Sequence, residues 1–185
     1  MNDANANNPD GNVIFSGTKE VAENLKFDQS RLQEWLGDSL PSAGKIIDVA
    51  QFKGGQSNPT YKIITEQKEL VLRRKPPGIL LPSAHAVDRE YKVMTALKDT
   101  AVPVPQTYGL CEDEDVIGTS FFVMDFLDGD IYWDLLLEDK SLEERKAIYK
   151  SKNQVIAELH KVDYTAVGLG DYGKPGNYIA RQVSR

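Results

Sequence analysis

The sequence has few of the residues that build disulfide frameworks or metal cages, and it has no long apolar run. Its 185 residues include one cysteine, Cys111, and two histidines, which excludes an internal disulfide framework and a cysteine-based metal site. No apolar stretch approaches the roughly 20 residues of a membrane-spanning helix, and residues 1–12 are Asn-rich without the apolar core of a signal peptide. We therefore expect a reducing, cytoplasmic setting and no membrane partner.

Basic residues are in the minority. Lys and Arg total 22 against 28 Asp and Glu, which gives a formal net charge of −6. A general nucleic-acid binder needs clustered Lys and Arg for its phosphate contacts, so we expect no nucleic-acid partner. With 41% hydrophobic residues, the chain is long enough to bury the core of one domain or slightly more.

The order of the predicted elements indicates an α+β fold. Residues 1–17 show no apolar period and are expected to form a disordered tail, after which Asp28 caps a short helix that stops near Gly37. Local alternation and turn signals predict five strands, over residues 45–52, 60–65, 69–75, 106–111 and 119–127. One helix, from Ser83 to about Asp99, interrupts them. Five consecutive strands with a single interruption favour an antiparallel sheet over alternating βαβ units.

The last third of the chain is predicted to be mainly helical. A short helix is expected over residues 131–137. Ser141 and Glu144 then form a capping box, which opens a long helix that ends near Lys161. The remainder, rich in Gly and Tyr, is predicted to be a loop that enters a new element only at its last residue.

A Gly-Gly turn between the first two strands is the first candidate binding feature. Gly54 and Gly55 let the backbone approach a ligand, and successive N–H groups in such a turn cradle anions. Gln56 follows, and Ser57 and Asn58 can add side-chain donors. The turn is not a P-loop, because no Gly-Lys-Ser/Thr follows and no helix opens there. An ordinary hairpin loop is the alternative explanation.

A basic residue on a strand and an acidic residue on the next helix form the second candidate. Period two along residues 69–75 places Val71, Arg73 and Lys75 on one face and Leu70, Leu72 and Arg74 on the other. Glu90 falls inside the apolar stripe of the following helix, where a carboxylate needs a partner, and Arg73 is the candidate. The alternatives are a solvated strand end, and a Glu90 that reaches water while Tyr91 is buried.

Seven phrases of the sequence together carry a resemblance to a known family. They are GGQSNPTY (54–61), VLRRKPPG (71–78), AHAVDREY (84–91), VPVP (102–105), FVMDFLDG (122–129), LH (159–160) and GLGDYGKPGNY (168–178). Over residues 28–185 the chain resembles the amino-terminal lobe of the aminoglycoside phosphotransferase and choline kinase-like superfamily. The most similar branch comprises phosphotransferase-like domains that are free in bacteria or fused to acyl-CoA dehydrogenase-like proteins.

The resemblance implies a protein-kinase-like N-lobe over residues 18–127, with five antiparallel strands and one packed helix. A hinge and the beginning of an incomplete C-lobe would follow over residues 128–185. The loop at residues 54–58 would cover the phosphates of ATP. Arg73 stands in the place usually held by a strand lysine, and Glu90 in the place of its helix partner. Lys75 remains a second candidate for the phosphate contact.

The strand over residues 119–127 would lead into the hinge. By resemblance, Met124 would line the back of the nucleotide pocket, and the backbone groups of Asp125 and Leu127 would pair with the adenine edge. A core strand that ends in a turn explains the same composition.

The resemblance also implies a catalytic loop that this chain does not contain. Such a loop needs His-x-Asp followed five residues later by Asn, and then a metal-binding Asp. His160 precedes Asp163 with one residue too many, and Gly168 stands where Asn is needed. Asp171 imitates the metal-binding Asp but belongs, by resemblance, upstream of the catalytic loop. We therefore assign no catalytic and no metal residue to this chain, and expect the Mg²⁺ ligands beyond Arg185.

Two hypotheses follow. The leading one is the ATP-binding part of a phosphotransferase that transfers the γ-phosphoryl group to a hydroxyl of an unknown small molecule, this chain alone being inactive. The alternative is a catalytically incomplete nucleotide-sensing or protein-interaction module, which a homodimer through the exposed lobe face would support.

Overall fold

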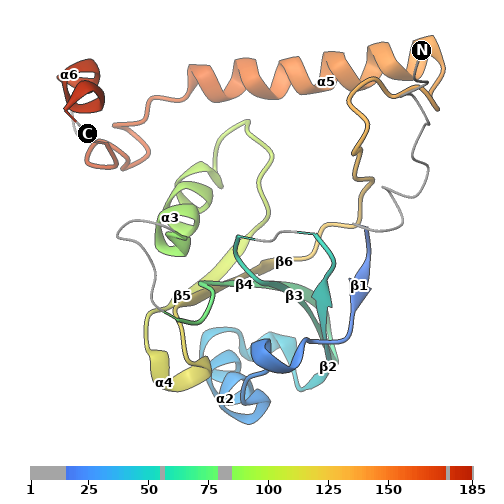
Figure 1. Ribbon diagram of the computed structural model, residues 1–185, viewed down its shortest axis with the longest axis vertical. Helices are drawn as coiled ribbons and strands as arrows, with labels where there is room; N and C mark the ends of the chain where they lie inside the picture. The colour runs from blue at the N-terminus through green and yellow to red at the C-terminus, as the bar shows by residue number, and fades with distance from the viewer. Residues whose placement is uncertain (1–15, 55–56, 79–84, 174–175, 185) are drawn as a thin grey trace, which may run out of the picture.

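A six-stranded antiparallel sheet forms the centre of the structure, a computed structural model that describes residues 16–54, 57–78, 85–173 and 176–184. The strands are β1 (Thr18–Lys19), β2 (Ile46–Phe52), β3 (Thr60–Thr65), β4 (Glu69–Arg74), β5 (Thr107–Cys111) and β6 (Phe121–Asp125). Their order across the sheet is β1-β2-β3-β4-β6-β5, and all neighbours run antiparallel (Figure 1). The predicted α+β class, a kinase-like N-lobe with part of a C-lobe, is confirmed.

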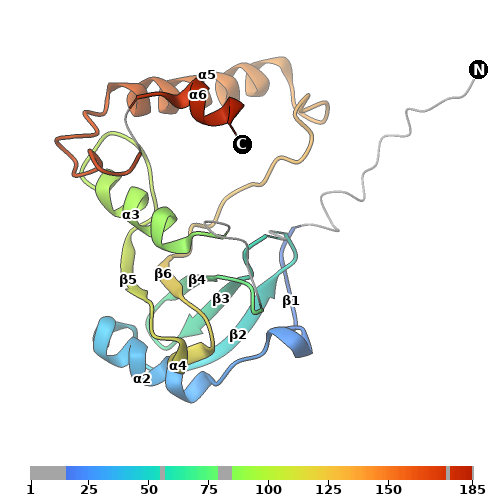
Figure 2. The ribbon, with the colours of Figure 1, turned by 60° about the vertical axis from the view of Figure 1, so that its left-hand side comes forward.

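Helices cover both faces of this sheet. The helices of the described residues are η1 (Glu23–Leu25), α2 (Gln29–Ser39), η2 (Pro41–Ala43), α3 (Val87–Leu97), α4 (Glu114–Ile117), α5 (Leu142–Lys161) and α6 (Tyr178–Val183), of which α5 and α6 lie away from the sheet. Figure 2 shows α2 and α4 on one face of the sheet and α3 on the other. The predicted caps hold, because the Asp28 side chain accepts from the N–H groups of Ser30 and Arg31, and Ser141 with Glu144 forms the capping box of α5.

The main core lies between α2 and one face of the sheet. Alternation along β4 sends Leu70 and Leu72, both 0% exposed, into this core. Val71 and Arg73 point to the opposite face, where α3 packs against β5 and β6. The core residues are Leu32, Leu36, Ala43, Val49, Tyr61, Ile63, Leu70, Leu72, Cys111, Ile117, Phe121 and Val123. The sheet therefore has one face for the core and another that is free to build a site.

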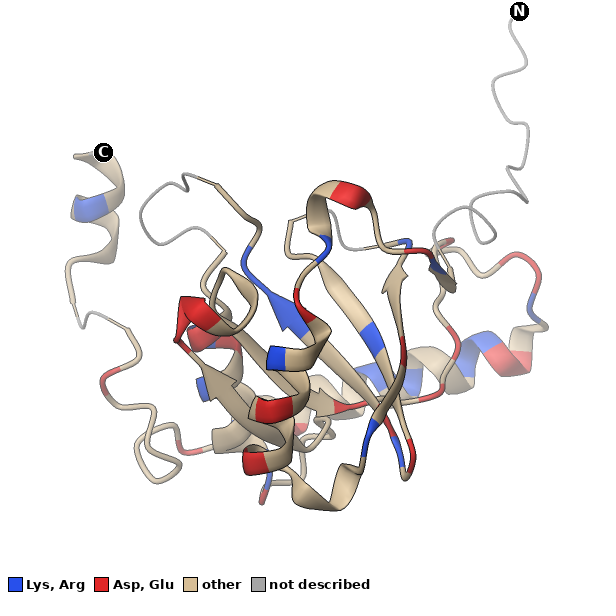
Figure 3. Ribbon diagram, turned by 90° about the horizontal axis from the view of Figure 1, so that it is seen from below, with Lys and Arg blue, Asp and Glu red and all other residues tan. Residues whose placement is uncertain are grey.

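The long helix α5 lies away from this core. Figure 1 shows it on the α3 side of the molecule, joined to β6 by an extended segment. None of its residues is buried, and apolar side chains such as Leu142, Ile156 and Leu159 are 43–58% exposed. In Figure 3, basic and acidic residues are interspersed along α5 and across the sheet. Across the described ranges, no helix combines the length and apolar character that a membrane span requires.

The number of strands differs from the prediction: the sheet has six strands rather than five. The additional strand, β1, is two residues long and shows no alternation that a sequence pattern could reveal. It is held by pairing, since Thr18 lies opposite Phe52, Lys19 lies opposite Gln51, and Lys53 N–H donates to the Gly17 carbonyl at 3.1 Å.

The prediction of a helix over residues 131–137 was wrong. The Asp134 carboxylate accepts hydrogen bonds from the N–H groups of Leu136 and Glu138, which stabilises a turn in place of a helix. Leu137 then adopts a left-handed φ of 52°, which a continuing helix does not allow.

Three smaller predictions also change. The acidic turn after β5 contains the short helix α4, which Asp113 caps and which Gly118 ends with a φ of 86°. The C-terminal segment becomes helical at Tyr178 rather than at the last residue. The helix predicted from Ser83 is observed from Val87, and Ser83 itself lies outside the described residues.

The cap of α2 gives a direct test of how this lobe is stabilised. Asp28→Ala removes the acceptor for two free N–H groups, so we expect a loss of about 1 kcal/mol in the free energy of unfolding. Asp38→Ala makes the same change in the last turn of the same helix, where a carboxylate opposes the helix dipole, and is expected to cause no loss. Urea denaturation followed by circular dichroism measures both, and an equal loss in both variants would contradict the capping role.

Candidate functional site

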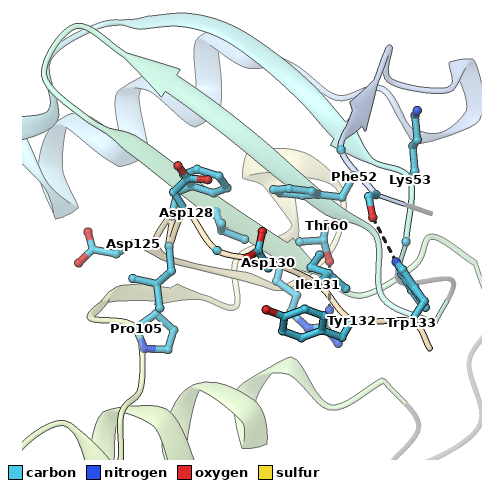
Figure 4. A pocket seen from close by; sticks show the side chains of 18 of the residues that line it. Phe52, Lys53, Thr60, Pro105, Asp125, Asp128, Asp130, Ile131, Tyr132 and Trp133 are labelled. Carbon is cyan, nitrogen blue, oxygen red and sulfur yellow. Dashed lines mark hydrogen bonds between the residues drawn. The ribbon is translucent and has the colours of Figure 1, made fainter. Parts of the chain in front are cut away.

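A pocket of about 1070 Å³ opens on the α3 side of the sheet. Residues of β2, β3, β4 and β6 form one side of the pocket, and the segment that follows β6 forms the opposite side. Figure 4 shows Phe52 and Thr60 of the sheet close to Ile131 and Tyr132 of that segment. The residues from the sheet and its loops that line the pocket are Phe52, Lys53, Gly54, Thr60, Val71, Arg73, Met124 and Asp125. The volume is that of a typical small-molecule site.

Arg73, which lines this pocket, pairs with Glu90 of α3, as the sequence predicted. Arg73 Nε donates to Glu90 Oε2 at 2.5 Å, and Nη2 donates to Glu90 Oε1 at 3.3 Å, so the guanidinium fork engages both carboxylate oxygens. A third bond, from Nη1 to Thr60 Oγ1 at 3.0 Å, follows from the register of the sheet, in which Thr60 lies opposite Arg73. Both side chains are about a third exposed, 27% for Arg73 and 32% for Glu90. Arg73 lines the pocket, whereas Glu90 is not among the described residues that line it.

The alternative cation, Lys75, takes a different position. Its Nζ lies 3.8 Å from Asp88 Oδ1 at the start of α3, and it is not among the described residues that line the pocket. Tyr91, the alternative buried residue of α3, packs its ring against Phe122 at 6.0 Å while Glu90 keeps its partner. Both residues therefore contact the sheet from the apolar stripe of α3, Tyr91 through an aromatic contact and Glu90 through an ion pair.

The structure describes three of the five predicted loop residues between β2 and β3. Gly54 lines the pocket, Ser57 is exposed, and Asn58 is buried with 3% of its surface accessible. Gly55 and Gln56 lie outside the described residues.

The buried Asn58 brings in a residue that the sequence analysis missed. Its Nδ2 donates to Glu90 Oε1 at 3.0 Å, and its Oδ1 lies 2.8 Å from His85 Nδ1. Sequence alone offered no signal for this contact, because the two residues are 27 positions apart and neither belongs to a known pairing motif. His85 thus joins the network that contains the Arg73–Glu90 pair.

The predicted hinge residues lie at the end of β6. Met124 and Leu127 line the pocket, and Leu127 is 64% exposed. Within the described ranges no acceptor is bonded to the Leu127 N–H, which leaves this donor available to a ligand. The Asp125 N–H, by contrast, donates to the Gln106 carbonyl at 2.9 Å.

The Asp125 side chain fastens the hinge to the sheet. Its Oδ1 accepts from the Tyr108 hydroxyl at 2.5 Å, and that hydroxyl accepts from Lys68 Nζ at 2.8 Å. Burial, followed by the bond to Asp125, raises the pKa of Tyr108, so the phenol stays protonated and donating at neutral pH. The bond to Tyr108 raises the pKa of Lys68, which keeps its ammonium charged. These contacts hold the start of the hinge in place.

Two further pocket residues come from the segment predicted to be a tail. Ser16 and Gly17 line the pocket, and Trp133 Nε1 donates to Ser16 Oγ at 3.1 Å, drawn as a dashed line in Figure 4. The rest of the predicted tail lies outside the described residues. Trp133 also lines the pocket, so an aromatic side chain from beyond the hinge faces the sheet.

The two aspartates that imitate catalytic residues have other partners. Asp163 accepts from the N–H groups of Thr165 and Ala166 in a turn after α5. Asp171 Oδ1 lies 2.7 Å from Lys92 Nζ, which holds the pKa of that carboxyl below its usual value. The described residues contain no group of three or more acidic, histidine or cysteine side chains that could hold a metal ion.

Comparisons with known proteins agree with one another. A model of the phosphotransferase enzyme family matches residues 48–185. A crystal structure of a "putative aminoglycoside phosphotransferase" from Ralstonia eutropha JMP134 is 49% identical, with a TM-score of 0.74 over 86% of this chain and 46% of that chain. Acyl-CoA dehydrogenase family member 10 of Mus musculus is 45% identical over 168 residues, and family member 11 of Rattus norvegicus is 42% identical over 175 residues.

The shared region is a fraction of each of these relatives. It covers 90% and 92% of this chain but 16% of the mouse protein and 22% of the rat protein. The predicted branch, phosphotransferase domains related to acyl-CoA dehydrogenase-like proteins, is therefore confirmed. Because the family model covers residues 48–185 and its structural neighbour shares the fold, this chain belongs to the phosphotransferase enzyme family.

Proposed function

We propose that this chain is the nucleotide-binding part of a small-molecule phosphotransferase, which transfers the γ-phosphoryl group of ATP to a hydroxyl of its substrate. The observation that carries the proposal is Arg73, which Glu90 holds in the wall of the pocket between a glycine-containing loop and the end of β6. In this proposal, residues 18–127 form the nucleotide-binding lobe, and residues 128–185 form the hinge and the beginning of the second lobe. Its setting is proposed to be reducing and cytoplasmic.

The pocket offers each part of ATP a chemically suitable surface. Phe52, Val71 and Met124 supply apolar contacts for the adenine ring, and the free Leu127 N–H supplies a donor for its edge. The Arg73 guanidinium supplies positive charge for the phosphates, since its planar fork binds phosphate oxygens as well as the Glu90 carboxylate. The loop at residues 54–58 is proposed to cover those phosphates with its backbone N–H groups.

Other parts of the reaction are proposed to lie outside this chain. Phosphoryl transfer depends on positioning and on neutralising charge, and Mg²⁺ bridging the phosphates supplies part of that neutralisation when bound. We propose that the Mg²⁺ ligands and the catalytic Asp lie beyond Arg185. We propose that the acceptor, a small molecule with a hydroxyl group, is selected mainly by residues outside this chain.

A second candidate function is favoured by one observation. Large apolar side chains are exposed on the C-terminal helices, among them Leu159, Tyr178, Ile179 and Val183 at 46–82%. Burying such a surface against a second copy would make the chain a nucleotide-sensing or protein-interaction module.

The phosphate contact can be tested by nucleotide titration of two basic variants. Arg73→Ala removes the proposed phosphate ligand, and we expect ATP affinity to fall about tenfold or more. Lys75→Ala removes a cation that directly follows the same strand and does not line the pocket, and it is expected to leave ATP affinity within about twofold. The emission of Trp133, which lines the pocket, reports binding, with Trp133→Phe as the control for that signal. Equal ATP affinity in the wild type and Arg73→Ala would remove Arg73 from the site.

The proposal that this chain does not catalyse the transfer by itself can be tested by turnover. The 185-residue chain, incubated with ATP, Mg²⁺ and a panel of alcohols, is expected to form no phosphorylated product. Release of phosphorylated alcohol above the level of an Arg73→Ala control, measured by mass spectrometry, would contradict this expectation.

Sedimentation equilibrium separates the two candidate functions. A monomer at micromolar concentration is expected for the phosphotransferase part. A dimer that Ile179→Glu dissociates, with an unchanged circular dichroism spectrum, would favour the interaction module.

A further inference from the structure

His85 has an unusual backbone conformation immediately before α3. Its φ angle is 57°, in the left-handed region that residues with a Cβ atom rarely adopt. The His85 carbonyl accepts a hydrogen bond from the Val87 N–H at 2.9 Å, so this bend leads directly into the first turn of α3. A conformation of this kind persists where surrounding contacts hold it in place.

The contact that holds it is the buried amide of Asn58, which joins the β2–β3 loop to α3. Because a carboxylate only accepts hydrogen bonds, the amide nitrogen of Asn58 must face Glu90, and the amide oxygen must then face His85. His85 Nδ1 therefore carries a proton and donates it to Asn58 Oδ1 at 2.8 Å. The direction of every bond in this chain is fixed by chemistry.

The hydrogen bonds continue beyond Glu90 and return to Asn58. Arg73 donates to Glu90 and to Thr60 Oγ1, and Thr60 Oγ1 donates to the Asn58 carbonyl at 3.0 Å. Asn58, Glu90, Arg73 and Thr60 thus form a closed ring, which we call the arginine ring. His85 is not part of this ring. It contacts the ring at the Asn58 amide, which donates a hydrogen bond through its nitrogen and accepts one through its oxygen.

Loss of the donor at His85 would leave the oxygen of the buried Asn58 amide without a hydrogen-bond partner. A buried acceptor without a partner is costly, so the Asn58 side chain would shift to find another donor. That shift would weaken its bond to Glu90, and with it the position of the guanidinium that Glu90 holds.

We infer that His85 is a positioning residue of the nucleotide site, which acts through Asn58 and Glu90 on the guanidinium of Arg73. The inference rests on the proposed function, because Arg73 is the group proposed to meet the ATP phosphates. His85 is not among the described residues that line the pocket, so its effect is transmitted through the arginine ring.

Three variants separate the donor from the rest of the side chain. His85→Leu removes the donor and keeps an apolar side chain of similar length. His85→Asn keeps a donor nitrogen at the δ position and tolerates a left-handed φ. His160→Leu is the matched control, since His160 is exposed in the last turn of α5.

The first measurement needs no nucleotide. In the full unliganded chain, the Nε–H proton of Arg73, assigned by its loss in Arg73→Lys, is expected to give a slowly exchanging NMR signal because Glu90 accepts from it. The signal is expected to persist in His85→Asn and His160→Leu, and to be lost or to exchange rapidly in His85→Leu. An unchanged signal in His85→Leu would overturn the inference.

The second measurement compares ATP with adenosine, which lacks phosphates. In His85→Leu we expect ATP affinity to fall about tenfold and adenosine affinity to change less than about twofold. In His85→Asn we expect both affinities to be close to those of the wild type. Equal losses for the two ligands would indicate a general structural role and would overturn the inference.

A folding control keeps both measurements decisive. If His85→Leu does not melt cooperatively by circular dichroism, His85→Gln replaces it, because its amide nitrogen lies one bond further out than the δ position. His85→Gln and His85→Asn are then compared by the same two measurements. A wild-type chain that binds no ATP at millimolar concentration would overturn the proposed function, whereas the Arg73 signal would still decide whether His85 holds the ring.

Discussion

The alternation of side chains along β4 is the constraint on which the rest of the structure depends. Successive residues of a strand point to opposite faces, so the same six residues that complete the core with Leu70 and Leu72 must also present Val71 and Arg73 to the pocket. A shift of one residue in register would move Arg73 from the pocket face to the core face, and Leu70 and Leu72 from the core face to the pocket face. The antiparallel pairing with β3 on one side and β6 on the other excludes that shift. The packing of the core therefore also fixes the position of Arg73 in the pocket.

An arginine in this position does more than a lysine could. A lysine ammonium is a point charge on a flexible stem, whereas the guanidinium is a rigid fork whose nitrogens engage Glu90 and Thr60 in fixed directions. Because both side chains are about a third exposed, solvent limits the net stabilisation that this ion pair contributes to folding. Its value lies in orientation, because the pair links β3, β4 and α3 at the pocket wall. With arginine in place of the usual strand lysine, the side chain makes three hydrogen bonds in fixed directions, two to Glu90 and one to Thr60.

Features that depend on local patterns were predictable, and those that depend on contacts distant in sequence were not. The Asp28 cap and the face of Arg73 follow from short-range chemistry, and the Arg73–Glu90 pair follows from the cost of an unpartnered carboxylate on an apolar stripe. The apolar residues of the segment 131–137 suggested a helix, but its side-chain-capped turn at Asp134 competes successfully for the same N–H groups. His85 escaped detection because its role exists only once α3 is packed beside the β2–β3 loop.

The two ends of the molecule differ in what holds them together. The sheet draws on a shared apolar core, whereas α5 has no buried residue and relies on its capping box and on ion pairs such as Lys161 with Glu158 within one turn. A helix supported in this way opens on its own, at a free-energy cost set by helix propagation rather than by loss of the core. We therefore expect the amide protons of α5 to exchange with solvent through local opening, and those of β4 and β6 to exchange only when the whole lobe unfolds. The helix α5 and the sheet are thus expected to open as separate units.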